Sequence, residues 1–391
     1  MRSIDFYFRG GMNFQLSEEH IAVQQAARDF AQMELLPGVI ERDIHEKFPM
    51  EQVRKLGALG FMGMMVDPNY NGGGMDTISY VLAMEEFSKI DASTSVVVSV
   101  NNSLVCYGLN AFGSEYQKEN FLKPLAAGVI HGAFCLSEPE AGSDATSQRT
   151  TAVDMGDHYL LNGTKNWITN GNSADTFLVM AQTDAEKGHK GINCLIVTKD
   201  MEGFQVGKKE DKMGIRGSDT HSIMFTDVKV PKENRIGEDG FGFKFAMKTL
   251  SGGRIGIAAQ ALGIASGALE LATKYAKERK AFGTEIKNHQ AIQFKLAEMA
   301  TQVESARLLT LKAAALKDAG ENYDIASSMA KLYASEIAQS VSSEAVQIHG
   351  GYGYVREYHV ERLMRDAKIT QIYEGTSEVQ KIVISRSLLK D

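Results

Sequence analysis

The hydrophobic pattern of the sequence changes twice, near Gly132 and again near Gly240, which limits the fold to a three-part arrangement. Before the first change and after the second, apolar residues recur at helical spacing. Between them, as far as Val230, short runs rich in β-branched residues are bounded by Gly, Asn and Asp. These runs recur about every ten residues without helical segments, which is typical of a small antiparallel barrel or sandwich.

We therefore predict a protein that is mostly α-helical with a central β domain. The expected N-terminal helical domain covers residues 12–132, the antiparallel β-barrel-like domain covers residues 133–240, and a C-terminal four-helix bundle covers residues 241–391. In the last part, Gln290 to Ala319 and Asp324 to Gly350 suit bundle helices of about four to seven turns. Residues 1–11 precede a second methionine, Met12, and lack the apolar core of a secretory signal, so we interpret them as an upstream extension.

The first helix is expected to begin after Ser17, a good N-cap residue, and to stop at Pro37. We expect Ile21, Phe30 and Met33 on its inward face.

Composition and charge exclude several classes of protein. The 391 residues suffice for two or three domains, and the content of 43% hydrophobic and 23% charged residues is ordinary for a soluble globular protein. Lys and Arg total 42 against 49 Asp and Glu, a net charge of -7, so neither a nucleic acid nor an anionic membrane surface is an expected partner. No apolar run reaches the roughly 18 residues of a membrane span. Cys106, Cys135 and Cys194 show no metal-ligand spacing and are expected to be small core residues in a reducing compartment.

One carboxylate has the surroundings of a general base. The segment Ile369 to Gln380, I-T-Q-I-Y-E-G-T-S-E-V-Q, places Glu374 among apolar and aromatic residues, directly before Gly375. Loss of hydration there would raise the pKa of the carboxyl above its usual value of about 4.3, which suits proton abstraction. A glutamate before a glycine is also common in turns, so from this segment alone Glu374 is either a base or a turn residue.

Four further segments carry polar residues and glycines at the expected domain junctions, where ligands often bind. Neither a G-x-G-x-x-G nor a P-loop pattern is present, so a dinucleotide-binding βαβ unit is not indicated. Trp167 can cover an aromatic ligand or fill the β-domain core, and Arg279 can meet a pyrophosphate or pair with an acid. The segments are Phe134 to Asp144, Asn166 to Gly171, Arg279 to Gly283 with His289 and Gln290, and the glycine cluster Gln347 to Gly353.

Taken in order, these segments resemble the acyl-CoA dehydrogenase family from about Met12 to the C-terminus. Six motifs follow that family's order: F-C-L-S-E-P-E-A-G-S-D, N-W-I-T-N-G, K-M-G-I-R-G-S-D-T, E-R-K-A-F-G, Q-I-H-G-G-Y-G and M-R-D-A-K-I-T-Q-I-Y-E-G-T. The stretch G-G-R-I-G-I-A-A-Q-A-L-G-I-A is most similar to the short-chain, butyryl-CoA branch. The resemblance implies FAD-dependent α,β-dehydrogenation of a short-chain acyl-CoA to the trans-2-enoyl-CoA, with electrons passed to an electron-transfer flavoprotein.

The resemblance also assigns roles to residues. Glu374 would remove the α-proton while the β-hydrogen leaves as hydride to flavin N5, and the backbone N–H of Glu374 would help to hold the thioester carbonyl. The positions that match acyl-CoA contacts are Ser143, Ser251, Gly252, Gly253, Arg254 and Gly375. The positions that match FAD contacts, in the family partly across a subunit boundary, are Phe134, Cys135, Leu136, Ser137, Glu138, Gly142, Ser143, Trp167, Ile168, Thr169, Arg279, His289, Gln290, Gln347, Ile348, His349, Gly350, Gly351, Thr376, Ser377 and Glu378.

Three comparisons with the branches of the family narrow this expectation. Ser251 stands where members often have Asp, which puts a hydrogen bond to CoA there in doubt. Gly253 stands where the isovaleryl and long-chain branches place the base, so Glu374 has no rival. The glutaryl-CoA branch uses an arginine near the position of Ser95, but Asp91 to Leu104 contains no Arg or Lys, so a dicarboxyl substrate is not expected.

Related activities stay open as alternatives: an acyl-CoA oxidase, a medium-chain or short branched-chain dehydrogenase and, more remotely, a non-catalytic DNA-binding relative. A purely structural helical protein is a further alternative, and it would bind no flavin. The resemblance also implies a homotetramer built as a dimer of dimers, in the bacterial cytoplasm or, in a eukaryote, the mitochondrial matrix.

Overall fold

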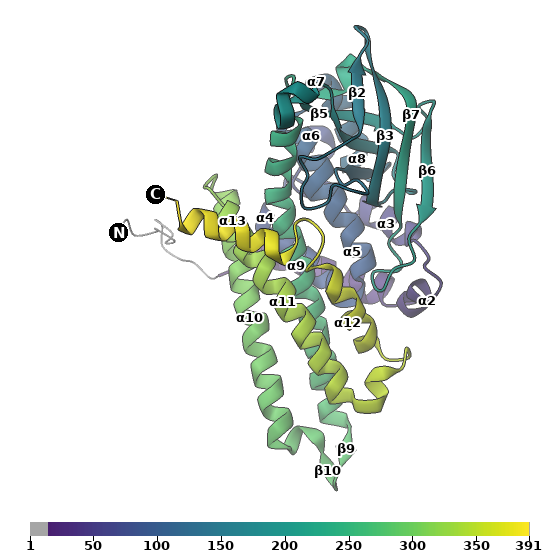
Figure 1. Ribbon diagram of the computed structural model, residues 1–391. Coiled ribbons are helices and arrows are strands. Elements are labelled where there is room, and N and C mark those ends of the chain that lie inside the picture. The colour runs from purple at the N-terminus through teal and green to yellow at the C-terminus, as the bar shows by residue number, and fades with distance from the viewer. Residues whose placement is uncertain (1–14, 391) are drawn as a thin grey trace.

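A computed structural model describes residues 15–390, and its elements follow the helical, β, helical order that the sequence predicts (Figure 1). Helices occupy the chain as far as Ala126, the main sheet runs from Gly132 to Ile236, and helices return at Gly242. The predicted fold class, mostly α with a central β domain, is therefore confirmed. The interpretation of residues 1–11 lies outside the described residues.

The N-terminal helices begin at side chains that satisfy free backbone N–H groups. Ser17 accepts from the N–H of His20 and forms a capping box with it, as the sequence predicts for an N-cap. Asp91 caps α5 in the same way through the N–H groups of Ser93 and Thr94. The α-helices are α1 (Glu18–Phe30), α2 (Val39–Ile44), α3 (Met50–Ala58), α4 (Thr77–Ile90), α5 (Ala92–Ser99), α6 (Tyr107–Phe112), α7 (Glu115–Gln117) and α8 (Lys123–Ala126). Three π-helical segments continue them: η1 (Ala31–Leu35), η3 (Val100–Cys106) and η4 (Lys118–Leu122).

The central domain is one eight-stranded sheet in the order β6-β7-β3-β2-β4-β5-β8, with β1 paired to β4. The pairing is largely antiparallel, as predicted, but β4 pairs in parallel with β1 and with β2. The strands are β1 (Gly132–Cys135), β2 (Thr151–Asp154), β3 (His158–Thr169), β4 (Thr176–Gln182), β5 (Ile192–Thr198), β6 (Phe204–Lys209), β7 (Thr220–Pro231) and β8 (Arg235–Ile236).

Strand β4 shows how the sheet joins two cores. Its side chains alternate across the sheet because successive residues of a strand point to opposite faces. Leu178 and Met180 pack into the core shared with the helices, whereas Phe177 and Val179 pack into a separate core of the β domain. Both sides are fully buried, which explains why β4 is a continuous apolar run with no polar alternation.

The C-terminal helices are α9 (Gly242–Glu278), α10 (Gln290–Asp318), α11 (Asp324–His349), α12 (His359–Ile369) and α13 (Ser377–Leu388). The short hairpin of β9 (Lys280–Ala281) and β10 (Thr284–Glu285) follows α9 and projects at the end of the bundle far from the main sheet (Figure 1). Helix α9 also packs closely on α4, because an added Cβ at Gly263 would lie 2.4 Å from the carbonyl oxygen of Glu85. By length and composition α9 could cross a membrane, but 83% of its most apolar window is buried, as in a core helix.

Candidate active site

Glu374 lies in the turn between α12 and α13, and this turn has an unusual backbone. Glu374 has φ +52° and Gly375 has φ +92°, so two consecutive residues are left-handed. This conformation costs a non-glycine residue of the order of 1 kcal/mol, so the surroundings must hold it. Two donors meet at the carbonyl oxygen of Gly375: Lys331 Nζ at 2.7 Å and Gln380 Nε2 at 2.9 Å.

The carboxyl group of Glu374 is buried although the residue as a whole is half-buried. Its Oε2 atom has no hydrogen-bond partner within residues 15–390. Burial raises the pKa of Glu374 to about 7, against the opposing positive charges of Lys331 and Arg254. Among the same residues the backbone N–H of Glu374 donates no hydrogen bond. An oxygen ready to take a proton and an N–H ready to hold a carbonyl therefore occur in one residue.

Helix α9 brings the predicted substrate residues to this carboxyl. An added Cβ at Gly253 would lie 2.2 Å from Glu374 Oε2 and 2.8 Å from Leu104 Cδ2, so only glycine leaves room for the carboxyl. Arg254 is buried and donates from one Nη to Ser328 Oγ at 3.1 Å, and burial lowers its pKa. Ser251 bonds only to Met247 of its own helix, at 3.3 Å, so the structure gives this hydroxyl no other protein partner within residues 15–390.

One turn further along α9, polar side chains close the space beyond the carboxyl. An added Cβ at Gly256 would lie 2.5 Å from the hydroxyl of Tyr80 and 2.7 Å from Ser99 Oγ. The next turn carries Gln260, which accepts from the hydroxyl of Tyr373 and donates to Ser95 Oγ at 3.0 Å. Tyr80, Ser95, Ser99 and Gln260 in this cluster are buried and hydrogen-bonded.

The first two predicted flavin segments lie side by side in the β domain. Strand β1 leads into the turn that holds Ser137, and the N–H of Asn166 donates to the carbonyl of Ser137 at 2.8 Å. Lys165, which is fully buried, ties the same turn down by donating to the carbonyl of Leu136 at 3.2 Å and to Glu138 Oε1 at 2.7 Å. These two segments, which are predicted to bind the flavin, are thus fixed relative to one another.

The sequence left open whether Trp167 covers an aromatic ligand or fills the core of the β domain. Its side chain is 60% exposed and its backbone has φ +61°, in an irregular part of β3 where the pairing with β7 shifts register. The alternative that Trp167 fills the core is wrong, because the next residue, Ile168, takes the buried position. A large exposed indole beside the Ser137 turn fits a planar aromatic ligand.

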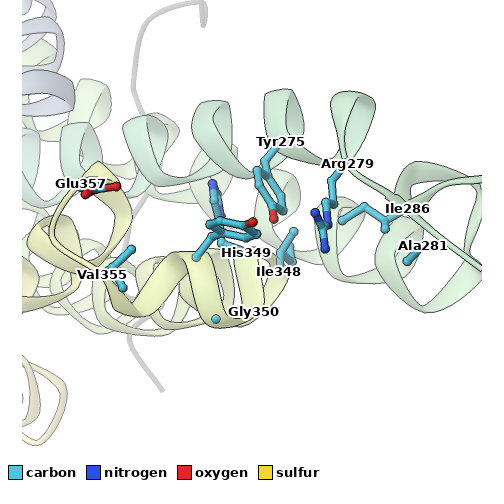
Figure 2. A pocket seen from close by; sticks show the side chains of 11 residues that line it. Tyr275, Arg279, Ala281, Ile286, Ile348, His349, Gly350, Val355 and Glu357 are labelled. Atoms are coloured by element: carbon cyan, nitrogen blue, oxygen red, sulfur yellow. The ribbon is translucent and has the colours of Figure 1, made fainter.

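A third group of predicted residues lines a cavity of about 650 Å³ between the ends of α9 and α11. Figure 2 shows Tyr275 and Arg279 reaching from α9 toward Ile348 and His349. The rings of Tyr275 and His349 stack with centroids 4.2 Å apart, and the Arg279 guanidinium lies 5.3 Å from the ring centroid of Tyr352. A cation without an ion pair among the described residues, on aromatic walls, can receive an anionic, partly aromatic group.

Two other predicted residues, His289 and Thr376, lie near the β9–β10 hairpin and at the start of α13. His289 contacts the carbonyl of Ala281 at 3.3 Å near the β9–β10 hairpin, and Thr376 caps α13 by accepting from the N–H of Val379. From Gly253 to Glu278 along α9 is about 38 Å, and from Lys331 to His349 along α11 is about 27 Å. The cavity and the carboxyl site are therefore well separated within one chain.

Several residues of the site were not predicted, and all of them depend on tertiary contacts. Lys331 and Gln380 hold the Gly375 carbonyl, Lys165 holds the segment predicted to bind the flavin, and Tyr275 lines the cavity. Lys331 lies among small residues near Ala330 and Ala334, but this pattern does not show whether the lysine turns inward. Within residues 15–390 no group of three or more His, Cys, Asp or Glu could hold a metal ion.

Comparison with known proteins covers almost the whole chain. Three family models match it: the acyl-CoA dehydrogenase N-terminal domain at residues 17–129, the middle domain at 133–228 and the C-terminal domain at 240–389. A relative in Clostridium acetobutylicum, a short-chain specific acyl-CoA dehydrogenase, is 51% identical over 97% of this chain and 100% of its own. A subunit of the caffeyl-CoA reductase-Etf complex of Acetobacterium woodii is 49% identical over 96% of this chain and 99% of its own. The solved butyryl-CoA dehydrogenase of Megasphaera elsdenii is 48% identical with a TM-score of 0.96, covering 97% of this chain and 100% of that one.

Proposed function

The chain belongs to the acyl-CoA dehydrogenase family, and we propose that it oxidises a short-chain, butyryl-CoA-like acyl-CoA to the trans-2-enoyl-CoA. The observation that carries this proposal is the buried Glu374 carboxyl, whose Oε2 lacks a partner among the described residues and faces Gly253. Glu374 takes the α-proton, and its backbone N–H donates to the thioester carbonyl, which stabilises the enolate as it develops. With its pKa raised to about 7, the carboxyl is ionised in part at neutral pH and is a stronger base than an ordinary glutamate.

The residues of the β domain fit a flavin. The exposed face of Trp167 and the turn at Ser137 provide an aromatic surface and backbone polar groups next to each other. We propose that FAD binds there with Thr169 and Ser143 and supplies the acceptor for the β-hydride. The chain's own part is to hold the ring system against the substrate and to exclude water from Glu374.

The distance from Glu374 to the Arg279 cavity supports a divided cofactor site. The separation is about 38 Å along α9 and about 27 Å along α11. Arg279, His349 and Gly350 are therefore too far from Glu374 to complete the same site within one chain. We propose that a second copy brings these residues to the flavin, in a homotetramer built as a dimer of dimers.

The polar cluster beyond Gly256 supports a short acyl chain. Tyr80, Gln260 and Tyr373 keep their hydrogen bonds only if no apolar chain displaces them, and burying them unpaired would cost about 1–3 kcal/mol each. We expect butyryl-CoA to be oxidised faster than hexanoyl-CoA, with activity declining further through C16.

The relative in the caffeyl-CoA reductase-Etf complex is relevant to two points, the electron partner and the direction of the reaction. We propose an electron-transfer flavoprotein as the partner, acting in the bacterial cytoplasm or, in a eukaryotic cell, the mitochondrial matrix. The same site can also run in reverse, as an enoyl-CoA reductase, because a carboxyl with a pKa of about 7 can return a proton as readily as it accepts one.

Anaerobic mixing of the holoenzyme with butyryl-CoA tests the proposal. The oxidised flavin absorbance should bleach in the unmodified enzyme, and Glu374→Gln should slow the bleaching by about 100- to 10,000-fold while flavin content is retained. Glu321→Gln, an exposed glutamate between α10 and α11, is the matched control and should bleach normally. Bleaching that continues at the normal rate in Glu374→Gln would exclude Glu374 as the base.

A further inference from the structure

Lys331 is a buried lysine in the first third of α11, and it is 0% exposed. Burying an ammonium group is costly unless a hydrogen bond or an opposite charge compensates. Lys331 forms no ion pair within residues 15–390, and its ammonium donates one hydrogen bond there, to the carbonyl oxygen of Gly375 at 2.7 Å. The single contact of this buried charge is therefore with the residue that follows the base.

The contact falls where the backbone of the turn needs support. Gly375 and Glu374 both have positive φ, and the Gly375 carbonyl also accepts from Gln380 Nε2 at 2.9 Å. With two donors on one oxygen, the Gly375–Thr376 peptide cannot rotate without leaving a buried ammonium unsatisfied. Gln380 Nε2 also donates to the carbonyl oxygen of Glu374 at 3.4 Å, so the Glu374–Gly375 peptide is held as well, and with it the Glu374 side chain that faces Gly253.

The charges around the turn also link Lys331 to Glu374. Glu374 is faced by Lys331 from α11, by Arg254 from α9 and by the hydroxyl of Tyr80 from α4. Lys331 is faced by Glu374 and also by Arg254, Glu336 and Glu378. Burial lowers the pKa of Lys331 to about 8, and Glu374 is the largest influence in the opposite direction. Each of the two groups favours the charged form of the other.

We propose that Lys331 is a positioning residue for the reaction, which fixes the Glu374–Gly375 turn and keeps Glu374 ionised before substrate is deprotonated. The assignment rests on the proposed role of Glu374 as the base. In this role Lys331 acts through the turn, by its hydrogen bond to the Gly375 carbonyl, and it keeps its proton while the α-proton moves to Glu374. A lysine that merely tied α11 to the turn would affect the rate equally at every pH, whereas a charge that acts on the base changes the pH profile.

The test measures flavin reduction by butyryl-CoA at low substrate concentration between pH 6 and pH 9. The acid limb of the unmodified holoenzyme should have its midpoint near pH 7. A positive charge lowers the pKa of a carboxyl, so its removal in Lys331→Met should raise the midpoint by about one unit. The rate should then fall roughly fivefold at pH 7 and approach a tenfold loss at pH 6, from ionisation alone.

Two further variants separate the charge from the hydrogen bond. Lys331→Gln keeps a donor without the charge, so its midpoint should rise as in Lys331→Met while its limiting rate at high pH exceeds that of Lys331→Met. Lys331→Arg keeps the charge and should retain a midpoint near pH 7. Ser335→Ala, one turn along α11, is the control and should match the unmodified enzyme, because among the described residues this hydroxyl bonds only to Leu332 of its own helix.

A midpoint that stays near pH 7 in both Lys331→Met and Lys331→Gln would overturn the proposal. If Lys331→Met fails to fold, the comparison of the Gln and Arg variants decides the same question. Glu374→Gln separates this result from the function itself: if Glu374→Gln is inactive and the Lys331 variants keep the normal midpoint, only the role of Lys331 is lost. If Glu374→Gln still reduces flavin, the proposed function fails first.

Discussion

At the scale of single residues, the Glu374 carboxyl has room because residue 253 is a glycine and has no side chain. A Cβ added to residue 253 would lie only 2.2 Å from Glu374 Oε2. A contact that short is impossible, and the other neighbour, Leu104, is also closer than normal contact to that Cβ. The carboxyl is the group that can move, so an alanine here should displace the base from its position.

We therefore predict that Gly253→Ala lowers the rate of flavin reduction by about 100-fold, a loss typical of a misplaced catalytic group. Gly252→Ala adds the same methyl one residue earlier, where its nearest neighbours would be 3.9 and 4.0 Å away. Its effect should be far smaller, and both alanines should favour the helix. Stopped-flow reduction, with flavin content measured in parallel, would show the difference. Equal rates in the two variants would mean that the carboxyl does not need the space at Gly253.

The residues of this site were predictable to different degrees. Glu374 and Gly253 stand in sequence motifs, so a resemblance could locate them. Lys331 and Gln380 could not be placed, because a lysine among small residues on a helix can extend to solvent as easily as turn inward. Their role follows from the meeting of α11, α13 and the turn at one carbonyl oxygen, which depends on tertiary structure.

At the scale of elements, the N-terminal helix shows where the helical pattern misleads. Of the three residues expected on its inward face, Phe30 is buried, but Ile21 is 55% exposed and Met33 is 67% exposed. The expectation for Met33 is wrong because the chain turns into a π-helix at Ala31–Leu35, where the N–H of Leu36 donates to Ala31. The wider turn shifts the buried face to Ala31 and Leu35.

Strand β3 also differs from a simple pattern, and the difference serves the site. It runs for 12 residues with two register shifts against β7, one at Gly163 and one just before Ile168. The second shift places Trp167 outward on a left-handed backbone, which alternation along a regular strand would not predict. The irregularity therefore presents the indole at the proposed flavin site.

Trp167→Ala should separate ligand binding from stability. Because the side chain is 60% exposed, its loss should change the free energy of unfolding of the flavin-free protein by no more than about 0.5–1 kcal/mol. Flavin content after purification should fall several-fold, since the aromatic surface is lost. Val153→Ala, at an exposed position of β2, is the control for both measurements. Normal flavin content in Trp167→Ala would show that the indole is not part of the flavin-binding site.

At the scale of the whole molecule, the residues predicted to bind FAD lie in two regions that are well separated within one chain. The three-part fold was predictable from changes in hydrophobic period, because each part has its own repeat. The proposed division of the cofactor site was not predictable from the pattern, since it follows from the lengths of α9 and α11, which end near Arg279 and His349, well away from Glu374. In the proposed assembly, a second copy contributes to the active site.

The β9–β10 hairpin offers a way to test this dependence. Phe282, at its tip, is 97% exposed and has φ +53°, and its ring meets that of His289 edge-on with centroids 6.0 Å apart. If the hairpin packs on a second copy, Phe282→Asp should place a buried charge in that contact and weaken it by several kcal/mol. We predict that light scattering will show a smaller assembly, and that flavin content will fall together with assembly because both depend on the same contact. Met155→Asp, at the exposed tip of the β2–β3 hairpin, adds the same charge elsewhere and should leave both unchanged. Loss of assembly without loss of flavin would show that each chain holds its cofactor alone.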